Sequence, residues 1–219
     1  MVQPHTRINN ILLGRWERPA LQWLAARIPA RVNPDVLTAV GVFGAGLTFM
    51  GYCLSNYFSA FLWLANLGFV INWFGDSLDG TLARYRQIER PKYGFFVDHT
   101  VDAFSEVLIV IGLGLSPYVT FSIACMGLIG YLLMSILVYI RTYVDGVFQL
   151  SYGKFGPTEV RVILILLNTV MFFWGTPNWE LPLHLTVYDL PIAAIAAILS
   201  ILFIVKSIKN ALKLAELKE

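Results

Sequence analysis

The chain has 219 residues, of which 57% are hydrophobic and only 14% are charged, and its mean hydropathy is +0.66. Soluble domains carry about a quarter charged residues, so this composition excludes an ordinary soluble domain and indicates a membrane protein. The formal net charge of +2 is uninformative as a sum, and we expect no nucleic-acid partner. Cys53 and Cys125 both lie in apolar runs and are interpreted as packing residues.

Residues 9–28 form the first predicted element. Apolar residues recur at helical spacing, and arginines are interleaved with them: Leu12, Leu13, Trp16, Ala20, Trp23 and Leu24. This pattern predicts an amphipathic helix in the cytoplasmic headgroup layer of a membrane, anchored by its tryptophans. The alternative is a soluble helix that packs on the loops.

Six apolar segments follow, each near the length of about 20 residues that a bilayer core requires. They are 35–55, 57–79, 94–115, 117–144, 158–175 and 188–206. The tight turns at 55–57 and 116–117 predict antiparallel neighbours. We therefore expect an all-α integral membrane protein with a single domain over 1–219, in which the interfacial helix precedes a six-helix bundle over 35–206.

The basic residues give the predicted orientation. All 16 lie before the first segment, between the second and third, around the connection of the fourth to the fifth, or after the sixth. The other connections, around 56, 116 and 176–187, contain none. Because cytoplasmic loops are enriched in lysine and arginine, this distribution predicts six spans with both termini in the cytoplasm.

Four aspartates lie at the cytoplasmic ends of the second and third segments. Asp76 and Asp79 are three residues apart, and Asp98 and Asp102 are four apart, so each pair shares one helical face. Four converging carboxylates repel one another, but divalent cations between them relieve that repulsion. Oxygen ligands favour Mg²⁺ or Mn²⁺, and two such ions suit a diphosphate. The alternative is that the aspartates cap helices and pair with Arg84, Arg86, Arg90 or Lys92.

Small residues and an arginine accompany the aspartates. Gly80 and Gly94 are costly inside helices and indicate the close approach of a backbone or ligand. Ala83 keeps the same surface small, and Arg84 adds a cation suited to phosphate. Together these residues indicate phosphoryl-group chemistry.

The stretch DSLDGTLAR…GFFVDHTVD resembles the signature of the CDP-alcohol phosphotransferases, D-x-x-D-G-x-x-A-R followed by G-x-x-x-D-x-x-x-D. All eight signature positions match: Asp76, Asp79, Gly80, Ala83, Arg84, Gly94, Asp98 and Asp102. VNPDVLTAVG at 32–41 is similar to the entry of that family into its first span. The resemblance covers most of the chain.

This resemblance implies a membrane enzyme of phospholipid biosynthesis, which transfers a substituted phosphate from a CDP-alcohol to an acceptor hydroxyl and releases CMP. Asp76, Asp79 and Asp98 are expected to ligate Mg²⁺ or Mn²⁺, and Asp102 to complete the metal site or act as the base. Gly80, Ala83, Arg84 and Gly94 are expected to bind the CDP moiety. The resemblance places the active site on the cytoplasmic side, where a membrane lipid and a nucleotide meet, and dimers are common in the family.

Two narrower resemblances concern the substrate. Asp98-His99 and the later Glu159 are similar to choline and ethanolamine phosphotransferases, which implies His99 as the base with Glu159. Residues 139–161 are similar to bacterial inositol-phosphate transferases, which implies that Arg141, Lys154 and Arg161 bind the phosphate of the acceptor. The two resemblances disagree about which substrate is the lipid, and the base remains open between Asp102 and His99.

Two other classes of function are weighed against the enzyme. A divalent-cation transporter would use the aspartates as its ion site, but transporters often show repeats and helices broken at mid-membrane. A scaffold that has kept only the fold does not explain intact aspartates. The position of all four carboxylates at one edge, with an arginine and glycines, favours the enzyme.

Overall fold

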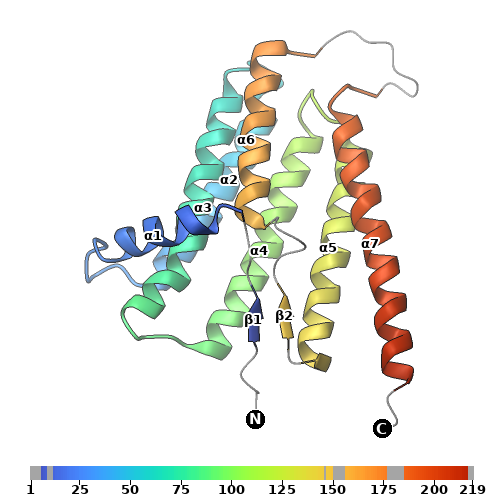
Figure 1. Cartoon of the computed structure of the whole chain (residues 1–219). Helices are drawn as coiled ribbons and strands as arrows, with labels where there is room; N and C mark the ends of the chain where they lie inside the picture. The colour runs from blue at the N-terminus through green and yellow to red at the C-terminus, as the bar shows by residue number, and fades with distance from the viewer. Residues whose placement is uncertain (1–5, 9–11, 146, 150–155, 177–184, 217–219) are drawn as a thin grey trace.

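The computed structural model describes residues 6–8, 12–145, 147–149, 156–176 and 185–216. Six long helices form a bundle, and a shorter helix lies across it (Figure 1). The helices are α1 (Gly14–Ala25), α2 (Pro34–Leu54), α3 (Phe61–Tyr85), α4 (Pro91–Gly114), α5 (Phe121–Asp145), α6 (Pro157–Trp174) and α7 (Asp189–Ala215). Each helix from α2 to α7 falls on one of the six predicted segments, which confirms the helical fold class.

Four of these helices, α2, α5, α6 and α7, are long and apolar enough to cross a membrane. Of the six long helices, α3 and α4 do not meet this test, and these two carry the four aspartates. The structure thus indicates a membrane protein, in which the two least apolar of the six long helices hold the candidate site.

The fold departs from the all-helical prediction at two short strands. β1 (Thr6–Ile8) pairs in parallel with β2 (Val147–Gln149), so that Thr6 lies opposite Val147. Strands of three residues are too short to show the alternation by which a strand is recognised in a sequence. The pair joins the segment before α1 to the segment after α5.

The closest helix packing is between α2 and α3. A Cβ atom added to Gly44 would lie 2.3 Å from the backbone nitrogen of Asn72, and one added to Gly75 would lie 2.3 Å from that of Gly41. Small residues allow helices in membranes to approach until their backbones touch. This contact holds the start of α2 against the stretch of α3 that carries Asp76 and Asp79.

A chain of buried polar side chains ties α6 to the same pair of helices. The Tyr52 hydroxyl donates to the side-chain oxygen of Asn168 at 2.9 Å, and the Asn168 amide donates to Asn66 at 2.8 Å. Asn168 is completely buried, so each hydrogen bond satisfies a group that has no access to solvent. Asn168 thus joins α6 to Tyr52 of α2 and to Asn66 of α3.

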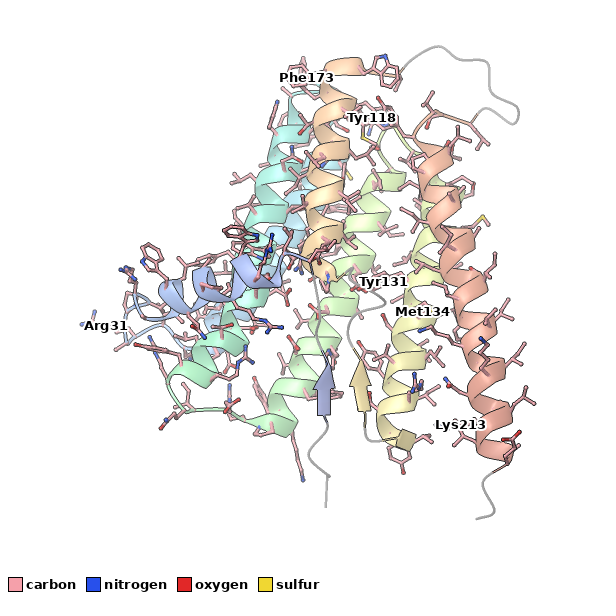
Figure 2. All side chains as sticks on the ribbon, viewed as in Figure 1. Arg31, Tyr118, Tyr131, Met134, Phe173 and Lys213 are labelled. Atoms are coloured by element: carbon pink, nitrogen blue, oxygen red, sulfur yellow. The ribbon has the colours of Figure 1, made fainter. Side chains whose placement is uncertain are left out.

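The two ends of the bundle differ in their residues. Tyr118 and Phe173 lie at one end and Lys213 at the other, together with β1, the α3–α4 connection and the end of α7 (Figures 1 and 2). At the first end, the carboxylate of Asp189 accepts hydrogen bonds from the backbone and hydroxyl of Thr120 at 2.7 and 2.6 Å. This carboxylate joins the start of α7 to the start of α5.

Helix α1 lies within the predicted range 9–28 and packs on two helices of the bundle. Leu21 and Ala25 are buried against Leu37, Leu78 and Leu82, so one face of the helix packs on α2 and α3. Trp16 and Trp23 lie 68% and 56% exposed. The helix therefore packs on the bundle and still presents the exposed tryptophans expected of a helix at a membrane surface.

Candidate active site

Asp79 is held in place by the neighbouring helix. Its Oδ2 accepts a hydrogen bond from the hydroxyl of Thr38 on α2 at 2.6 Å, and its Oδ1 accepts one from the backbone of Gly80. Thr38 lies one turn into α2, whose N-terminus is capped by the side chain of Asn33. The close packing of α2 on α3 therefore sets the orientation of the Asp79 carboxylate.

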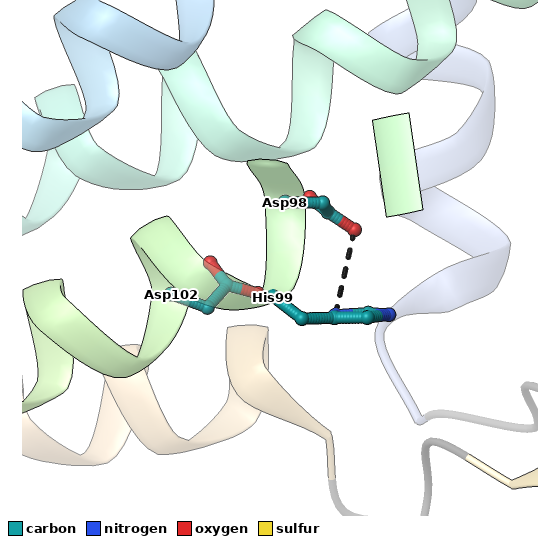
Figure 3. A group of neighbouring side chains, drawn as sticks. All are labelled: Asp98, His99 and Asp102. Atoms are coloured by element: carbon teal, nitrogen blue, oxygen red, sulfur yellow. Dashed lines mark ion pairs between the residues drawn. The ribbon is translucent and has the colours of Figure 1, made fainter. Parts of the chain in front are cut away.

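The aspartates of α4 lie beside a histidine (Figure 3). The His99 Nδ1 is 3.8 Å from the Asp98 Oδ2, and one ligand atom each from Asp98, His99 and Asp102 lie within 4.8 Å of one another. The imidazole contacts Phe95 edge-on, with ring centroids 4.3 Å apart, and Tyr139 of α5 at 5.2 Å. These rings restrict the movement of His99 at the edge of the acidic cluster.

A small cavity lies between α2, α3 and α4, and three of the four aspartates line it. Its lining residues are Thr38, Gly41, Asn72, Asp76, Asp98, Val101, Asp102 and Ser105. Asp76 of α3 and Asp102 of α4 both face this cavity. Asp79 does not line the cavity, but its carboxylate accepts a hydrogen bond from Thr38, which does. Asp76 of α3 and both aspartates of α4 thus lie around one cavity, in keeping with their spacing.

Arg161 brings a third helix to the aspartates. Its Nη2 lies 2.6 Å from the Oδ2 of Asp76, and its Nε donates to the side-chain oxygen of Asn72 at 2.9 Å. The Asn72 amide in turn donates to the backbone oxygen of Gly41 at 3.0 Å. An arginine predicted for an acceptor phosphate therefore contacts a predicted metal ligand.

The α3–α4 connection is fastened to the segment before α2. The Arg86 guanidinium donates to the backbone oxygens of Val32 and Ile28, and Arg90 pairs with Asp35. The hydrogen bond to Asp35 raises the pKa of Arg90 above its ordinary value. The sequence left both arginines as alternative partners for the four aspartates of the site. In the structure Arg86 instead contacts the segment before α2, and Arg90 contacts Asp35.

The residues predicted for the CDP moiety lie along α3 and at the start of α4. A Cβ atom at Gly80 would lie 3.3 Å from the Arg84 Nη1, while one at Gly94 would have no atom within 4 Å. Arg84 also donates to the hydroxyl of Thr81 at 3.2 Å. The guanidinium lies over Gly80, and space remains open at Gly94.

Glu159 lies at the start of α6, where both of its oxygens accept hydrogen bonds from backbone amides. Oε1 accepts from Leu13, directly before α1, at 2.8 Å, and Oε2 accepts from Gly156 at 2.9 Å. The side chain is buried, with 5% of the residue exposed. One carboxylate therefore caps the N-termini of two helices, and neither of these hydrogen bonds involves His99.

Glu17 of α1 accepts two hydrogen bonds that the sequence did not predict. Its Oε1 accepts hydrogen bonds from Trp73 Nε1 and the Thr158 hydroxyl, both at 2.7 Å. Trp73 precedes Asp76 on α3, and Thr158 precedes Arg161 on α6. An acidic residue in an amphipathic helix has many possible partners, so only the fold reveals these two.

The remaining predicted phosphate ligands do not gather around Arg161 in the described contacts. Arg141 lies near the end of α5 and does not line the cavity. Lys154 lies outside the described residues. Of this predicted group, Arg161 is the member that the structure brings to the aspartate cavity.

The profile of the CDP-alcohol phosphatidyltransferase family matches residues 31–206. The chain belongs to this family. The match covers most of the chain, from just before α2 to the later part of α7, and therefore includes every predicted site residue. The family suggested by the aspartate signature is confirmed.

Curated relatives include two cholinephosphotransferases. Cholinephosphotransferase 1 of Gallus gallus is 32% identical over 200 residues, covering 86% of this chain and 58% of the relative. Cholinephosphotransferase 1 of Danio rerio is 30% identical over 173 residues, covering 73% and 43%. The chain thus spans about half the length of these relatives.

A shorter match connects the chain to a bacterial relative. Phosphatidylinositol phosphate synthase of Cutibacterium acnes is 34% identical over 90 residues, which cover 41% of each chain. The names of these relatives thus match both of the narrower resemblances in the sequence, to choline phosphotransferases and to inositol-phosphate transferases. All three named relatives are transferases or synthases, in keeping with a family of enzymes.

Proposed function

We propose that the chain is a metal-dependent enzyme of phospholipid biosynthesis, which transfers a substituted phosphate group from a CDP-alcohol to an acceptor hydroxyl and releases CMP. The observation that carries this proposal is the convergence of three signature aspartates, Asp76, Asp98 and Asp102, on one cavity between α2, α3 and α4. Membership of the family supplies the class of reaction.

The donor set of the cavity fits a hard divalent cation. Asp76, Asp79, Asp98 and Asp102 offer carboxylate oxygens, which suit Mg²⁺ or Mn²⁺, and the cluster of Asp98 with Asp102 is compact. We propose that these four residues hold two such ions. When bound, the ions neutralise charge that develops on the diphosphate. The hydrogen bonds from Thr38 and Gly80 fix the orientation of the Asp79 carboxylate, whether or not ions are bound.

The base that deprotonates the acceptor hydroxyl is Asp102 or His99 in this proposal. Asp102 lines the cavity, while His99 stands beside Asp98 with its ring held by Phe95 and Tyr139. A base must lie within hydrogen-bond reach of the proton that it takes. His99→Ala separates the two, because Asp102→Asn would also remove a proposed metal ligand. Loss of turnover in His99→Ala with nucleotide binding retained assigns the base to His99, and a near-normal rate assigns it to Asp102.

The predicted role of Glu159 beside His99 is tested in the same way. Its hydrogen bonds to Leu13 and Gly156 support a role in holding α1 and α6 together. If Glu159 instead assists the base, Glu159→Gln abolishes turnover without a loss of thermal stability.

The CDP moiety is proposed to bind along α3 and the start of α4. Arg84 supplies a cation for the phosphates, while Gly80, Ala83 and Gly94 leave room for the nucleotide. The open space at Gly94 supports this placement. The charge of the arginine and the small side chains act together, since a phosphate must approach the backbone closely.

The donor is proposed to be a CDP-linked head group, with a membrane lipid as acceptor, because similarity to the cholinephosphotransferases extends over most of the chain. The phosphatidylinositol phosphate synthase match favours the reverse arrangement, in which CDP-diacylglycerol is the donor and Arg161, with Arg141 and Lys154, binds the acceptor phosphate. A matrix of CDP-choline, CDP-ethanolamine, CDP-inositol and CDP-diacylglycerol against lipid and water-soluble acceptors distinguishes the two.

The proposed topology has six spans, from α2 to α7, with the active site and both termini in the cytoplasm. The exclusive placement of lysine and arginine on one side supports this orientation, as do the four strongly apolar helices. In this arrangement α1 lies at the cytoplasmic surface. Accessibility of cysteines introduced at positions 56 and 88 to an impermeant reagent in intact cells tests it, since only the first is expected to react.

A divalent-cation transporter remains the second candidate. It would use the same carboxylates, and liposome flux measurements separate the two functions. The enzyme proposal predicts CMP release without cation flux. Uptake of Mn²⁺ into protein-containing liposomes, with no CMP from any donor and acceptor pair, would favour the transporter.

A further inference from the structure

Helix α1 lies across the bundle, and its start meets the start of α6 (Figure 1). The Oε1 of Glu17 on α1 accepts a hydrogen bond from the hydroxyl of Thr158 on α6 at 2.7 Å. In the other direction, Glu159 of α6 accepts a hydrogen bond from the backbone amide of Leu13, directly before α1, at 2.8 Å. The two helices therefore hold each other at their N-terminal ends.

The same oxygen of Glu17 also holds α3. It accepts a hydrogen bond from the Trp73 Nε1 at 2.7 Å. The Ser77 hydroxyl, one turn further along α3, lies 3.4 Å from this oxygen. Trp73 and Ser77 are four residues apart and share one face of the helix. One carboxylate oxygen thus joins α1, α3 and α6.

Arg161 holds the neighbouring row of α3 side chains. Its guanidinium contacts Asn72 and Asp76, and each of these comes directly before a residue that contacts Glu17. Thr158 and Arg161 are three residues apart on α6, so they also share a face. The contacts of Glu17 and of Arg161 therefore fasten the same stretch of α3 to the same face of α6.

The surroundings of α6 give these polar contacts their weight. Among the helices that the structure describes, α6 packs mainly on α3, and contact with one helix leaves room for rotation and sliding. Hydrogen bonds between side chains help to fix such helices in a membrane. Asn168 supplies two of them further along α6. At the start of α6, Glu17 supplies the link that sets the position of Arg161 relative to α3.

We propose that Glu17 is a positioning residue of the aspartate site. Its hydrogen bonds keep the start of α6 at the rotation in which Arg161 reaches Asp76. The Arg161 contact then orients the Asp76 carboxylate, which lines the cavity. This inference rests on the proposed function, in which Asp76 is a metal ligand. None of the described residues of α1 lines the cavity, so α1 acts on the site through α3 and α6.

The test measures the Mn²⁺ affinity of the purified full chain by paramagnetic resonance of the free ion. Thr158→Val removes the hydroxyl that reaches Glu17 and keeps the shape of the side chain. It is expected to weaken binding by about 3- to 10-fold, less than the roughly 10- to 100-fold loss when a direct partner of a metal ligand is removed. Thr169→Val is the matched control on the same helix, because the Thr169 hydroxyl donates to the backbone of Ile165. The control should bind Mn²⁺ as the wild type does.

The background variant Arg161→Gln shows whether Glu17 acts through Arg161. In that background Thr158→Val should cause no further loss of Mn²⁺ affinity, because the side chain that it positions is already gone. A merely structural contact would give the same loss in both backgrounds. The proposal is overturned by that equal loss, or by a Thr158→Val variant that binds Mn²⁺ as tightly as the wild type.

Variants of Glu17 itself complete the first readout. Glu17→Gln keeps an acceptor oxygen for the hydroxyl and the indole, whereas Glu17→Leu removes it. Glu17→Gln should therefore restore most of the Mn²⁺ affinity that Glu17→Leu loses. Gln22→Leu, at an exposed position of α1, is the control for an added apolar side chain. Equal affinities of Glu17→Leu and Gln22→Leu would contradict the proposal.

Thermal unfolding without metal separates this inference from the proposed function. Thr158→Val and Arg161→Gln together should lower the unfolding temperature by less than the sum of their separate effects, because the two contacts depend on each other. Additive losses overturn the positioning role. If the wild-type chain binds no Mn²⁺ and the two losses are still coupled, the proposed metal site fails while the positioning of Arg161 by Glu17 stands.

Discussion

Arg161 on α6 and Asp76 on α3 form an ion pair, with Nη2 and Oδ2 2.6 Å apart. The same guanidinium holds Asn72, so one side chain binds two positions that lie one helical turn apart on α3. The pair ties α6 to the aspartate cavity and offsets part of the charge of its carboxylates. A residue predicted for the acceptor phosphate thus also organises the proposed metal site.

Arg161→Gln is expected to lower the free energy of unfolding by about 3 kcal/mol, because removal of one partner leaves the other charge uncompensated in a largely buried place. Thermal unfolding in detergent measures this loss. Arg31→Gln, at an exposed position before α2, is the control and should change stability by less than about 0.5 kcal/mol. Equal stability of the two variants would show that the ion pair contributes little.

Thr38→Val is expected to weaken Mn²⁺ binding by about 10- to 100-fold, the usual effect of removing a hydrogen bond that orients a metal ligand. The Thr38 hydroxyl holds Asp79, and Thr38→Ser keeps that hydroxyl. Paramagnetic resonance of free Mn²⁺ gives the affinity. Thr100→Val is the control, since the exposed Thr100 hydroxyl donates to Phe96 of its own helix. An unchanged affinity in Thr38→Val contradicts the role given to this hydroxyl.

The bundle was largely predictable because its signals are local. Apolar runs of sufficient length mark the helices, and the paired spacing of Asp76 with Asp79 and of Asp98 with Asp102 places each pair on one face. The short polar connection between them predicts that α3 and α4 pack on each other, but in the described structure α2 packs on both helices instead. Thr38 and Gly41 of α2 therefore line the cavity with the aspartates, which the spacing of the carboxylates does not predict.

Contacts between distant segments were not predictable. Thr38 reaches Asp79 only because the glycines of α2 and α3 let their backbones touch. The resemblance to choline and ethanolamine phosphotransferases implies Glu159 as a catalytic partner of His99, but its described hydrogen bonds are those of a helix cap. The pairing of β1 with β2 depends on the bundle bringing two remote segments together, and neither strand is long enough to show a pattern.

Gly75→Ala is expected to destabilise the chain by about 1–3 kcal/mol, the range for overpacking a tight core. The added methyl group would overlap the backbones of Gly41 and Leu37, at 2.3 and 2.4 Å. Gly46→Ala on α2 is the matched control because its Cβ would have no atom within 4 Å. That variant should be neutral or more stable, by up to about 1 kcal/mol. Similar unfolding temperatures for both variants would contradict the close α2–α3 contact.

Glu159→Ala is expected to cost about 1–2 kcal/mol of stability, because two helix N-termini lose a capping acceptor. The loss of the Leu13 contact should also expose α1, so trypsin cleaves after Arg15 faster than in the wild type. Glu89→Ala, in the exposed α3–α4 connection, is the control for both measurements. Unchanged unfolding and proteolysis in Glu159→Ala would remove the capping role and leave the catalytic one.

The proposed reaction takes place at the aspartate cavity and releases CMP from a CDP-alcohol. The direct measurement is CMP production by the purified chain with Mg²⁺ or Mn²⁺ across the matrix of donors and acceptors, beside Asp98→Asn and the control Asp35→Asn. Asp35 lies near the site but pairs with Arg90. We expect CMP from the wild type and from Asp35→Asn, and none above background from Asp98→Asn. No CMP from any pair, or equal release by Asp98→Asn, would contradict it.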